Sequence, residues 1–412
     1  MTTGRIHQLL DDPEELEALY RQDPGAFARA LKEASRTAPD SLVVRAWRAR
    51  LGSQKPDDGA AKRRALATAV GVALICGAFL RIPALFLGED WYYPRFAPSA
   101  VMLALSAYFW IGNTQDRRRL GAGLGLALAS AVYVSLLPGY TDSVVMALIH
   151  LPIVFWVFLG LVFMGDSWHE TESRILFVRY NGELVVLASL VALGGIVFSG
   201  VTVALFEMVS DNVEELYFEN AVILGGAAVP LVGTYLYDSV FNRRTGIPAV
   251  LARVFAPLFL VMSITYLIVA FLGGQNPFVD RSFLITFNGL LLVVLGITIF
   301  SIVERDTDSS TGLIDYINIA LATVTLLINA IALAAILFRL ASYGFTPNRV
   351  TVLGANLIIM VHLARMCWAY FRVVRGRAGF TGMRRVVTSY LPVYGAWAAV
   401  VAFLLPLAFW FS

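Results

Sequence analysis

Cysteine is almost absent from this chain, which has only two, Cys76 and Cys367, both inside long apolar segments. Two cysteines placed in this way exclude a disulfide framework and argue against a thiolate metal site. We expect both to be small apolar packing residues. Charged residues are also scarce, at 15% of the chain, against about 25% in a typical soluble domain. This composition argues against an ordinary soluble protein.

Several catalytic and ligand-binding motifs are missing as well. The sequence has no Gly-rich phosphate loop, no dinucleotide fingerprint and no Gly-x-Ser-x-Gly. His169, Glu170 and Glu172 cluster without the His-Glu-x-x-His spacing of zinc enzymes. We therefore expect no cofactor and no metal, and an enzyme is not favoured. The arginine clusters alternate with apolar segments, which predicts loops at a membrane and contacts with membrane lipids, and no nucleic-acid partner.

What the chain does have is hydrophobic length, since apolar residues make up 58% of it. From Ala65 onward they form about eleven runs of about 20 residues, the length that a helix needs to cross a bilayer of about 30 Å. The predicted fold class is all-α: a polytopic transmembrane helical bundle with a small N-terminal cytoplasmic helical module. The predicted spans are 65–86, 97–112, 120–137, 143–164, 183–206, 220–241, 248–272, 283–303, 313–341, 349–371 and 389–411.

The predicted domains are a helical module at 1–51, a polar linker at 52–64 and a transmembrane domain at 65–412. In the module, Asp12 followed by Pro13 marks a helix start, and another helix begins near Ser41. No cleavable signal peptide is visible in the first sixty residues, so the N-terminus is expected to be cytoplasmic. The basic clusters at 62–64, 117–119, 243–244 and 372–385 then all lie inside, as the positive-inside rule requires. An odd number of spans places the C-terminus on the periplasmic or extracellular side.

Five short motifs distributed over the predicted spans carry a resemblance to a known family. They are Arg179-Tyr180-Asn181-Gly182-Glu183, Glu214-Glu215-Leu216-Tyr217-Phe218, Ala252-Arg253-Val254-Phe255-Ala256-Pro257, Arg281-Ser282-Phe283-Leu284 with Asn288, and Tyr343-Gly344-Phe345-Thr346-Pro347-Asn348-Arg349. As a set they resemble the bacterial polytopic membrane proteins grouped as domain of unknown function 4153. The resemblance implies a bacterial cytoplasmic (inner) membrane protein and implies no activity.

Polar residues inside spans are costly, so each needs a partner, a water-filled cavity or a position near the interface. On the predicted cytoplasmic side we expect Asp238 to approach Arg253 across a short helix hairpin. His362 and Arg365 share one helix face. The predicted polar cavity comprises Glu183, Asp238, Arg253, Asn288, Asn329, His362 and Arg365. The alternative for each is a structural pair or a hydrogen bond that joins two helices.

On the outer side, Arg81 can reach Glu89 or Asp90. Arg339 and Arg349 break the orientation trend, which predicts an outer charged network with the acidic residues before the sixth span. Its acidic members are Glu214, Glu215 and Glu219. The alternative is a vestibule that attracts anions. Glycines at 194–200 and 225–226 are expected to let the fifth and sixth spans pack closely.

Three functions remain open. The first is transport or permeation through the polar cavity of spans five to ten. The second is a sensor or assembly scaffold in which residues 1–51 dock a cytoplasmic protein partner. The third is an enzyme acting on a lipid-linked substrate. The sequence determines neither the substrate nor the oligomeric state.

Overall fold

The computed structural model describes residues 9, 12–22, 27, 30–31, 33–34, 41–52, 58–207, 217–243, 246–272, 281–305 and 311–412. Every regular element among these residues is a helix, as predicted. The chain divides into two compact units, Met1–Arg64 and Ala65–Ser412.

The first unit contains α2 (Pro13–Gln22) and α4 (Leu42–Gly52). The side chain of Asp12 accepts a hydrogen bond from the backbone N–H of Glu15 at 3.1 Å, which confirms the predicted cap. The apolar residues at helical spacing form a small core. Its buried members are Leu16, Leu19, Phe27, Ala30, Leu31, Ala34 and Trp47.

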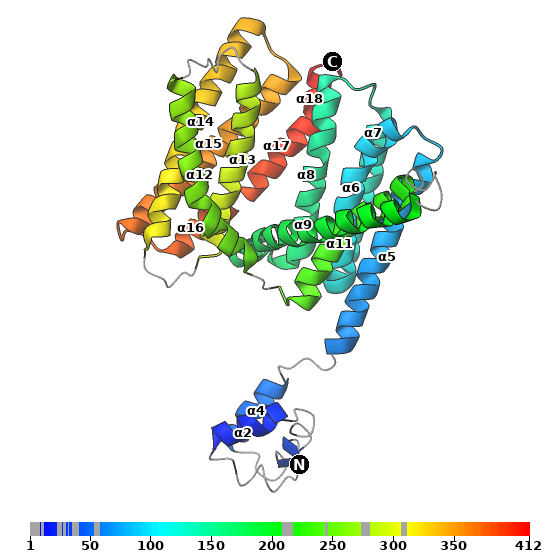
Figure 1. The fold of residues 1–412 in the computed structure, drawn as a ribbon, viewed down its shortest axis with the longest axis vertical. Helices are drawn as coiled ribbons and strands as arrows, with labels where there is room; N and C mark the ends of the chain where they lie inside the picture. The colour runs from blue at the N-terminus through cyan, green and yellow to red at the C-terminus, as the bar shows by residue number, and fades with distance from the viewer. Residues whose placement is uncertain are drawn as a thin grey trace. The chain divides into compact units, whose positions relative to one another are not determined.

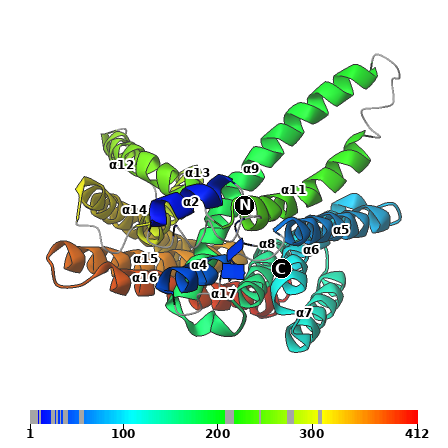
Figure 2. The same cartoon turned by 90° about the horizontal axis from the view of Figure 1, so that it is seen from below.

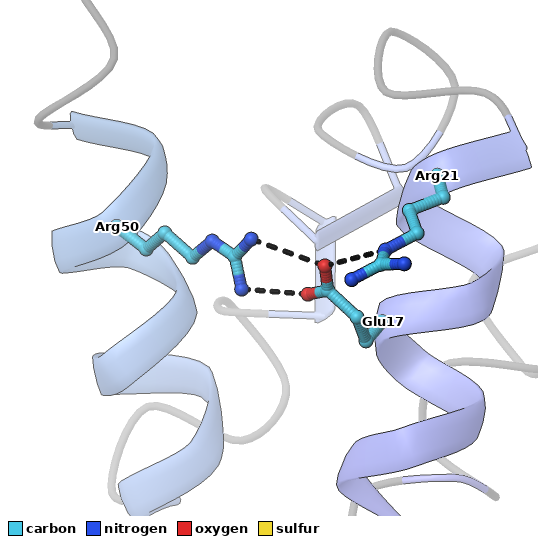
Figure 3. Close-up of polar contacts among 3 residues, drawn as sticks. All are labelled: Glu17, Arg21 and Arg50. Atoms are coloured by element: carbon cyan, nitrogen blue, oxygen red, sulfur yellow. Dashed lines mark hydrogen bonds and ion pairs between the residues drawn. The ribbon is translucent and has the colours of Figure 1, made fainter.

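One carboxylate links α2 to α4 (Figure 3). Glu17 of α2 forms ion pairs with Arg50 of α4 at 2.6 Å and with Arg21 at 3.0 Å. The Arg50 guanidinium also lies over the rings of Tyr20 and Trp47. Hydrogen bonds from Arg50, and then from Arg21, lower the pKa of Glu17 below its ordinary value.

The second unit is a bundle of helices, most of them long and apolar. They are α5 (Asp58–Ala84), α6 (Glu89–Phe109), α7 (Arg117–Leu136), α8 (Asp142–Met164), α9 (Thr171–Glu207), α11 (Ile223–Tyr235), α12 (Ile247–Leu272), α13 (Arg281–Val303), α14 (Leu313–Tyr343), α15 (Pro347–Val374), α16 (Phe380–Thr388), α17 (Leu391–Ala399) and α18 (Leu405–Ala408). Among the described residues, ten helical segments are long and apolar enough to cross a membrane. The protein is therefore a polytopic helical membrane protein. The predicted eighth span corresponds to α13, whose apolar segment Phe287–Val303 is shorter than these ten.

Several helices begin earlier than predicted. Residues 58–64, predicted as linker, form the first turns of α5; α9 begins at Thr171, and α6 begins at Glu89. In α6, Pro94 removes a backbone donor, and the freed carbonyl of Asp90 accepts a hydrogen bond from the Tyr140 hydroxyl instead. Since a neighbouring side chain satisfies this carbonyl, the helix continues through the proline.

The long helices form two groups (Figures 1 and 2). One group contains α12 to α16 and the other contains α5 to α8 with α11, while α8 contacts both α15 and α17 between them. The 37-residue α9 runs obliquely past both groups. At 1.5 Å per residue it is about 55 Å long, so it must tilt to remain within a bilayer.

The predicted glycine packing between the fifth and sixth spans is wrong in position. A Cβ at Gly194, Gly195 or Gly200 would meet nothing within 4 Å. The close approach of α11 to α9 lies instead at Gly233, where a Cβ would be 3.2 Å from the backbone nitrogen of Ala188.

Candidate functional site

Three cavities follow one another along α7; we name them by the predicted orientation. The inner cavity has a volume of about 550 Å³ and lies between α7, α8, α9 and α17. The middle cavity has about 230 Å³ and lies between α6, α7 and α8. The outer cavity has about 520 Å³ and lies between α5, α6, α7 and α8.

Neighbouring cavities share lining residues. Arg119 and Phe158 line both the inner and the middle cavity. The middle and outer cavities share Leu103, Ala107, Leu124 and Ala127. The three cavities therefore form one row and are not separate defects.

The row covers α7 from its first turn to its last. Lining residues extend from Arg118 to Val134, which at 1.5 Å per residue is about 24 Å of helix. That length is most of a bilayer core of about 30 Å. Small residues such as Gly123 and Ala127 leave space for the cavities on this face of α7. The row thus follows α7 through most of the thickness of a bilayer core.

The walls are mainly apolar, and the charged lining residues are all arginines. At the inner end these are Arg118, Arg119 and Arg174. Arg119 forms ion pairs with Asp166 at 2.5 Å and with Asp116 at 3.5 Å. Arg174 donates from Nε to the carbonyl of Trp168 at 2.8 Å.

Arg95 lies at the outer end and is only 2% exposed. Its guanidinium donates to the carbonyls of Trp91, Val134 and Pro138 at 3.0 to 3.2 Å. It also lies 4.9 Å from the ring of Trp91 and 4.7 Å from the ring of Tyr140. No carboxylate among the described residues pairs with it. Carbonyl dipoles and aromatic faces alone stabilise this buried cation, which is otherwise costly in a membrane.

Two of the predicted cavity residues meet at the loop between α11 and α12. Asp238 pairs with Arg243 at 2.6 Å and accepts a hydrogen bond from Tyr108 at 3.3 Å. The buried carboxylate of Glu183 accepts from the backbone N–H of Gly246 at 3.1 Å. The predicted pairing of Asp238 with Arg253 is wrong. Arg253 is exposed on α12, and the Asp238 carboxylate pairs with Arg243 in the following turn instead.

The remaining predicted cavity residues lie elsewhere in the bundle. The Nδ1 atom of His362 is 2.7 Å from the Tyr394 hydroxyl, and its ring stacks on Tyr390 at 4.3 Å. Arg365 lies over the same Tyr390 ring at 5.2 Å. Asn329 donates to the backbone carbonyl of Asn356 at 3.0 Å between α14 and α15.

The oxygen of Asn288 on α13 has no hydrogen-bond partner among the described residues. The seven predicted residues are thus distributed over several sites, and none of them lines the three cavities along α7.

The outer charged network has Arg81 at its centre. Arg81 pairs with Glu219 at 2.8 Å and with Glu89 at 3.2 Å, and donates to Asn220 at 2.9 Å. Glu214 and Glu215 lie outside the described residues.

Of the two arginines predicted for this network, Arg349 has other partners. Arg349 donates to the carbonyls of Tyr343 and Gly344 at 3.0 and 2.9 Å. It therefore caps the end of α14 rather than pairing with Glu219. Arg339 is half-buried near the end of α14.

A second set of ion pairs joins α9, α13, α14 and α16 at the predicted cytoplasmic end. Arg179 pairs with Glu304 at 3.1 Å, and Arg305 pairs with the buried Asp315 at 2.9 Å. Arg384 donates to the carbonyl of Arg305 at 2.7 Å. Burial raises the pKa of Glu304, and the nearby Arg179 opposes this rise. These contacts stabilise the packing of the helix ends.

Sequence reasoning missed the residues of the cavity row. The available signal was the run of small residues at 121–125 directly after the basic cluster at 117–119. Arg95 was missed because the second span was placed after it. Among the described residues, no group of three His, Cys, Asp or Glu side chains could hold a metal.

Comparisons with family models, curated proteins and solved structures gave no match. The family resemblance therefore stays a prediction.

Proposed function

We propose that this protein moves an amphiphilic substrate across the membrane along α7. The observation that carries the proposal is that the three cavities adjoin one another, each sharing lining residues with its neighbour, and together follow α7 from Arg118 to Val134. A substrate with an apolar chain can travel along apolar walls at low cost, while its polar end meets an arginine at either end. This retains transport as the function and moves its pathway from spans five to ten to spans one to four.

The proposal includes a bacterial cytoplasmic membrane with the N-terminus inside. The distribution of arginines supports this orientation. The N-terminal end of α7 and the short α16 carry Arg117, Arg118, Arg119, Arg384 and Arg385. Such basic helix ends belong on the cytoplasmic side.

The test is a flux measurement in proteoliposomes. The purified protein is reconstituted with tail-labelled fluorescent phosphatidylcholine or phosphatidylglycerol, and a membrane-impermeant reductant destroys the label in the outer leaflet. Movement of either lipid faster than in empty vesicles, and faster than with heat-unfolded protein, supports the proposal. Rates equal to those of empty vesicles for both lipids would overturn it.

A second candidate function is a scaffold that uses the first unit to dock a cytoplasmic protein. The observation that favours it is that Met1–Arg64 forms a compact unit with its own core. Deleting residues 1–52 should then abolish the protein's activity in cells. The remaining bundle should still move lipid in proteoliposomes. Unchanged function in cells would contradict the scaffold.

A further inference from the structure

The inner cavity combines an apolar interior with unneutralised positive charge at its mouth. The three charged residues that line it, Arg118, Arg119 and Arg174, are all cationic. Opposite charges near them are unequally distributed, so the three arginines differ in their capacity to bind a ligand.

Arg119 is committed to the protein because Asp166 and Asp116 both pair with it. Arg118 is exposed and forms no ion pair among the described residues. Arg174 uses its Nε for the carbonyl of Trp168, and no carboxylate among the described residues pairs with it. Two guanidinium groups thus retain donors for an anion. Planar guanidinium donors match the oxygens of a phosphate group.

The interior of the cavity fits a hydrocarbon chain. Its volume of about 550 Å³ lies within the range of about 300 to 1,000 Å³ typical of small-molecule sites. Aromatic and aliphatic side chains form its walls; among them are Trp156, Phe158, Leu161, Met164 and Phe177. Trp168 lies among the residues at the mouth, where an amphipathic indole suits a membrane interface.

The other end of the row has the same charge. Arg95 lines the outer cavity, and no carboxylate in the described part of the chain pairs with it. An anionic group therefore meets a cation at both ends of α7 and mainly apolar walls between them. A cationic substrate would find neither end favourable.

We infer that the substrate is an anionic glycerophospholipid, whose phosphate binds Arg118 and Arg174 while an acyl chain occupies the inner cavity. This inference rests on the transport proposed above, and it adds the substrate class and the residues that recognise it. Anionic lipids are concentrated in the cytoplasmic leaflet, the side on which the inner cavity is proposed to open.

The test measures binding without requiring transport. The full-length protein is placed in nanodiscs that contain phosphatidylglycerol or phosphatidylcholine with brominated acyl chains, which quench nearby tryptophans. The W156F/W168F variant shows the quenching of the other tryptophans. The difference between its quenching and that of the wild type reports lipid in the inner cavity. We expect phosphatidylcholine to reach half-saturation at a concentration about tenfold higher than phosphatidylglycerol. The R118Q and R174Q variants should lose the preference. The R117Q variant should keep it, since Arg117 has the same charge and lines none of the three cavities.

Native mass spectrometry of bound lipid provides a second readout that does not depend on the tryptophan variants folding. Equal binding of the two lipids, or an equal loss of preference in R117Q, would overturn the inference. Displacement of the brominated lipid by inorganic phosphate alone would also overturn it, because the site would then recognise a small anion. Anionic preference without flux would refute the transport proposal and retain the binding site. Flux without anionic preference would refute the binding site and retain the transport proposal.

Discussion

The ring of Phe158 lies over Gly123, and a Cβ at residue 123 would be only 2.7 Å from its Cζ atom. Phe158 lines both the inner and the middle cavity, so its ring stands at their junction. The absent side chain at Gly123 provides the space that the ring occupies. Phe158 is therefore the side chain whose movement would open one cavity to the next.

Replacing Phe158 by leucine should increase lipid flux, because a smaller side chain widens the junction. The matched control is Phe163→Leu, a change of the same size on the same helix at a residue that lines none of the three cavities. The flux is measured in proteoliposomes as the lipid fluorescence that an external reductant destroys. A melting curve checks the fold of each variant. An equal change of flux in both variants would refute the role of Phe158.

Burial should decide how much an aspartate–arginine pair contributes to stability. Asp315 is 1% exposed in its pair with Arg305, whereas Asp166 is 97% exposed in its pair with Arg119. Asp315→Asn removes the buried carboxylate from its pair with Arg305, and breaking a buried pair typically costs about 3–5 kcal/mol. Asp166→Asn removes an exposed pair, worth about 0–1 kcal/mol. Equal losses of unfolding free energy in the two variants would contradict the structure.

The contact between α15 and α17 requires a glycine. A Cβ at Gly354 would overlap the indole ring of Trp397, whereas a Cβ at Gly125 on α7 would meet nothing within 4 Å. We predict that Gly354→Ala destabilises the protein by about 1–3 kcal/mol through overpacking. Gly125→Ala should be neutral, or stabilising by about 1 kcal/mol through helix propensity. Unfolding of both variants in detergent measures the difference in their stability. A Gly354→Ala protein as stable as the wild type would count against the contact between Gly354 and Trp397.

The first unit should become less stable in acid. The pKa of Glu17 is lowered from 4.5 by Arg50 and Arg21, so its carboxylate stabilises the folded unit at any pH above about 4.5. This contribution is lost as the pH falls through the lowered pKa. Glu17→Gln should therefore increase hydrogen exchange in α2 and α4 at pH 7, and its difference from wild type should shrink in acid. Glu14→Gln, in the same helix, is the control; a pH-independent difference for Glu17→Gln would contradict the assignment.

The sequence predicts the helical architecture well because hydropathy directly reflects the requirement for apolar side chains in lipid. It also predicts the cap at Asp12, where the hydrogen bond is local. The partner of Asp238 could not be predicted, since Asn242 and Arg243 adopt positive φ angles of 48° and 62° and turn Arg243 back toward it. The short loop between the sixth and seventh spans pointed to Arg253 instead.

The cavity row was also beyond the sequence. Cavities arise where the packed surfaces of several helices fail to fill the space between them, and no single segment encodes that. The glycines of α7 indicate a narrow helix, but only the positions of α6 and α8 show which face is left open. The surroundings of Arg95 could not be predicted either, because two of its carbonyl partners, Val134 and Pro138, lie about 40 residues away along the chain.

The most direct test of transport along α7 is to obstruct the row at one point. Ala127 lines both the middle and the outer cavity, whereas Ala129, two residues away on the same helix, is exposed and lines neither. Lipid flux would be measured in proteoliposomes for Ala127→Phe and Ala129→Phe at matched protein content, with a melting curve for each. The account predicts that Ala127→Phe abolishes flux and that Ala129→Phe leaves it at the wild-type rate. Undiminished flux in a folded Ala127→Phe protein would contradict it.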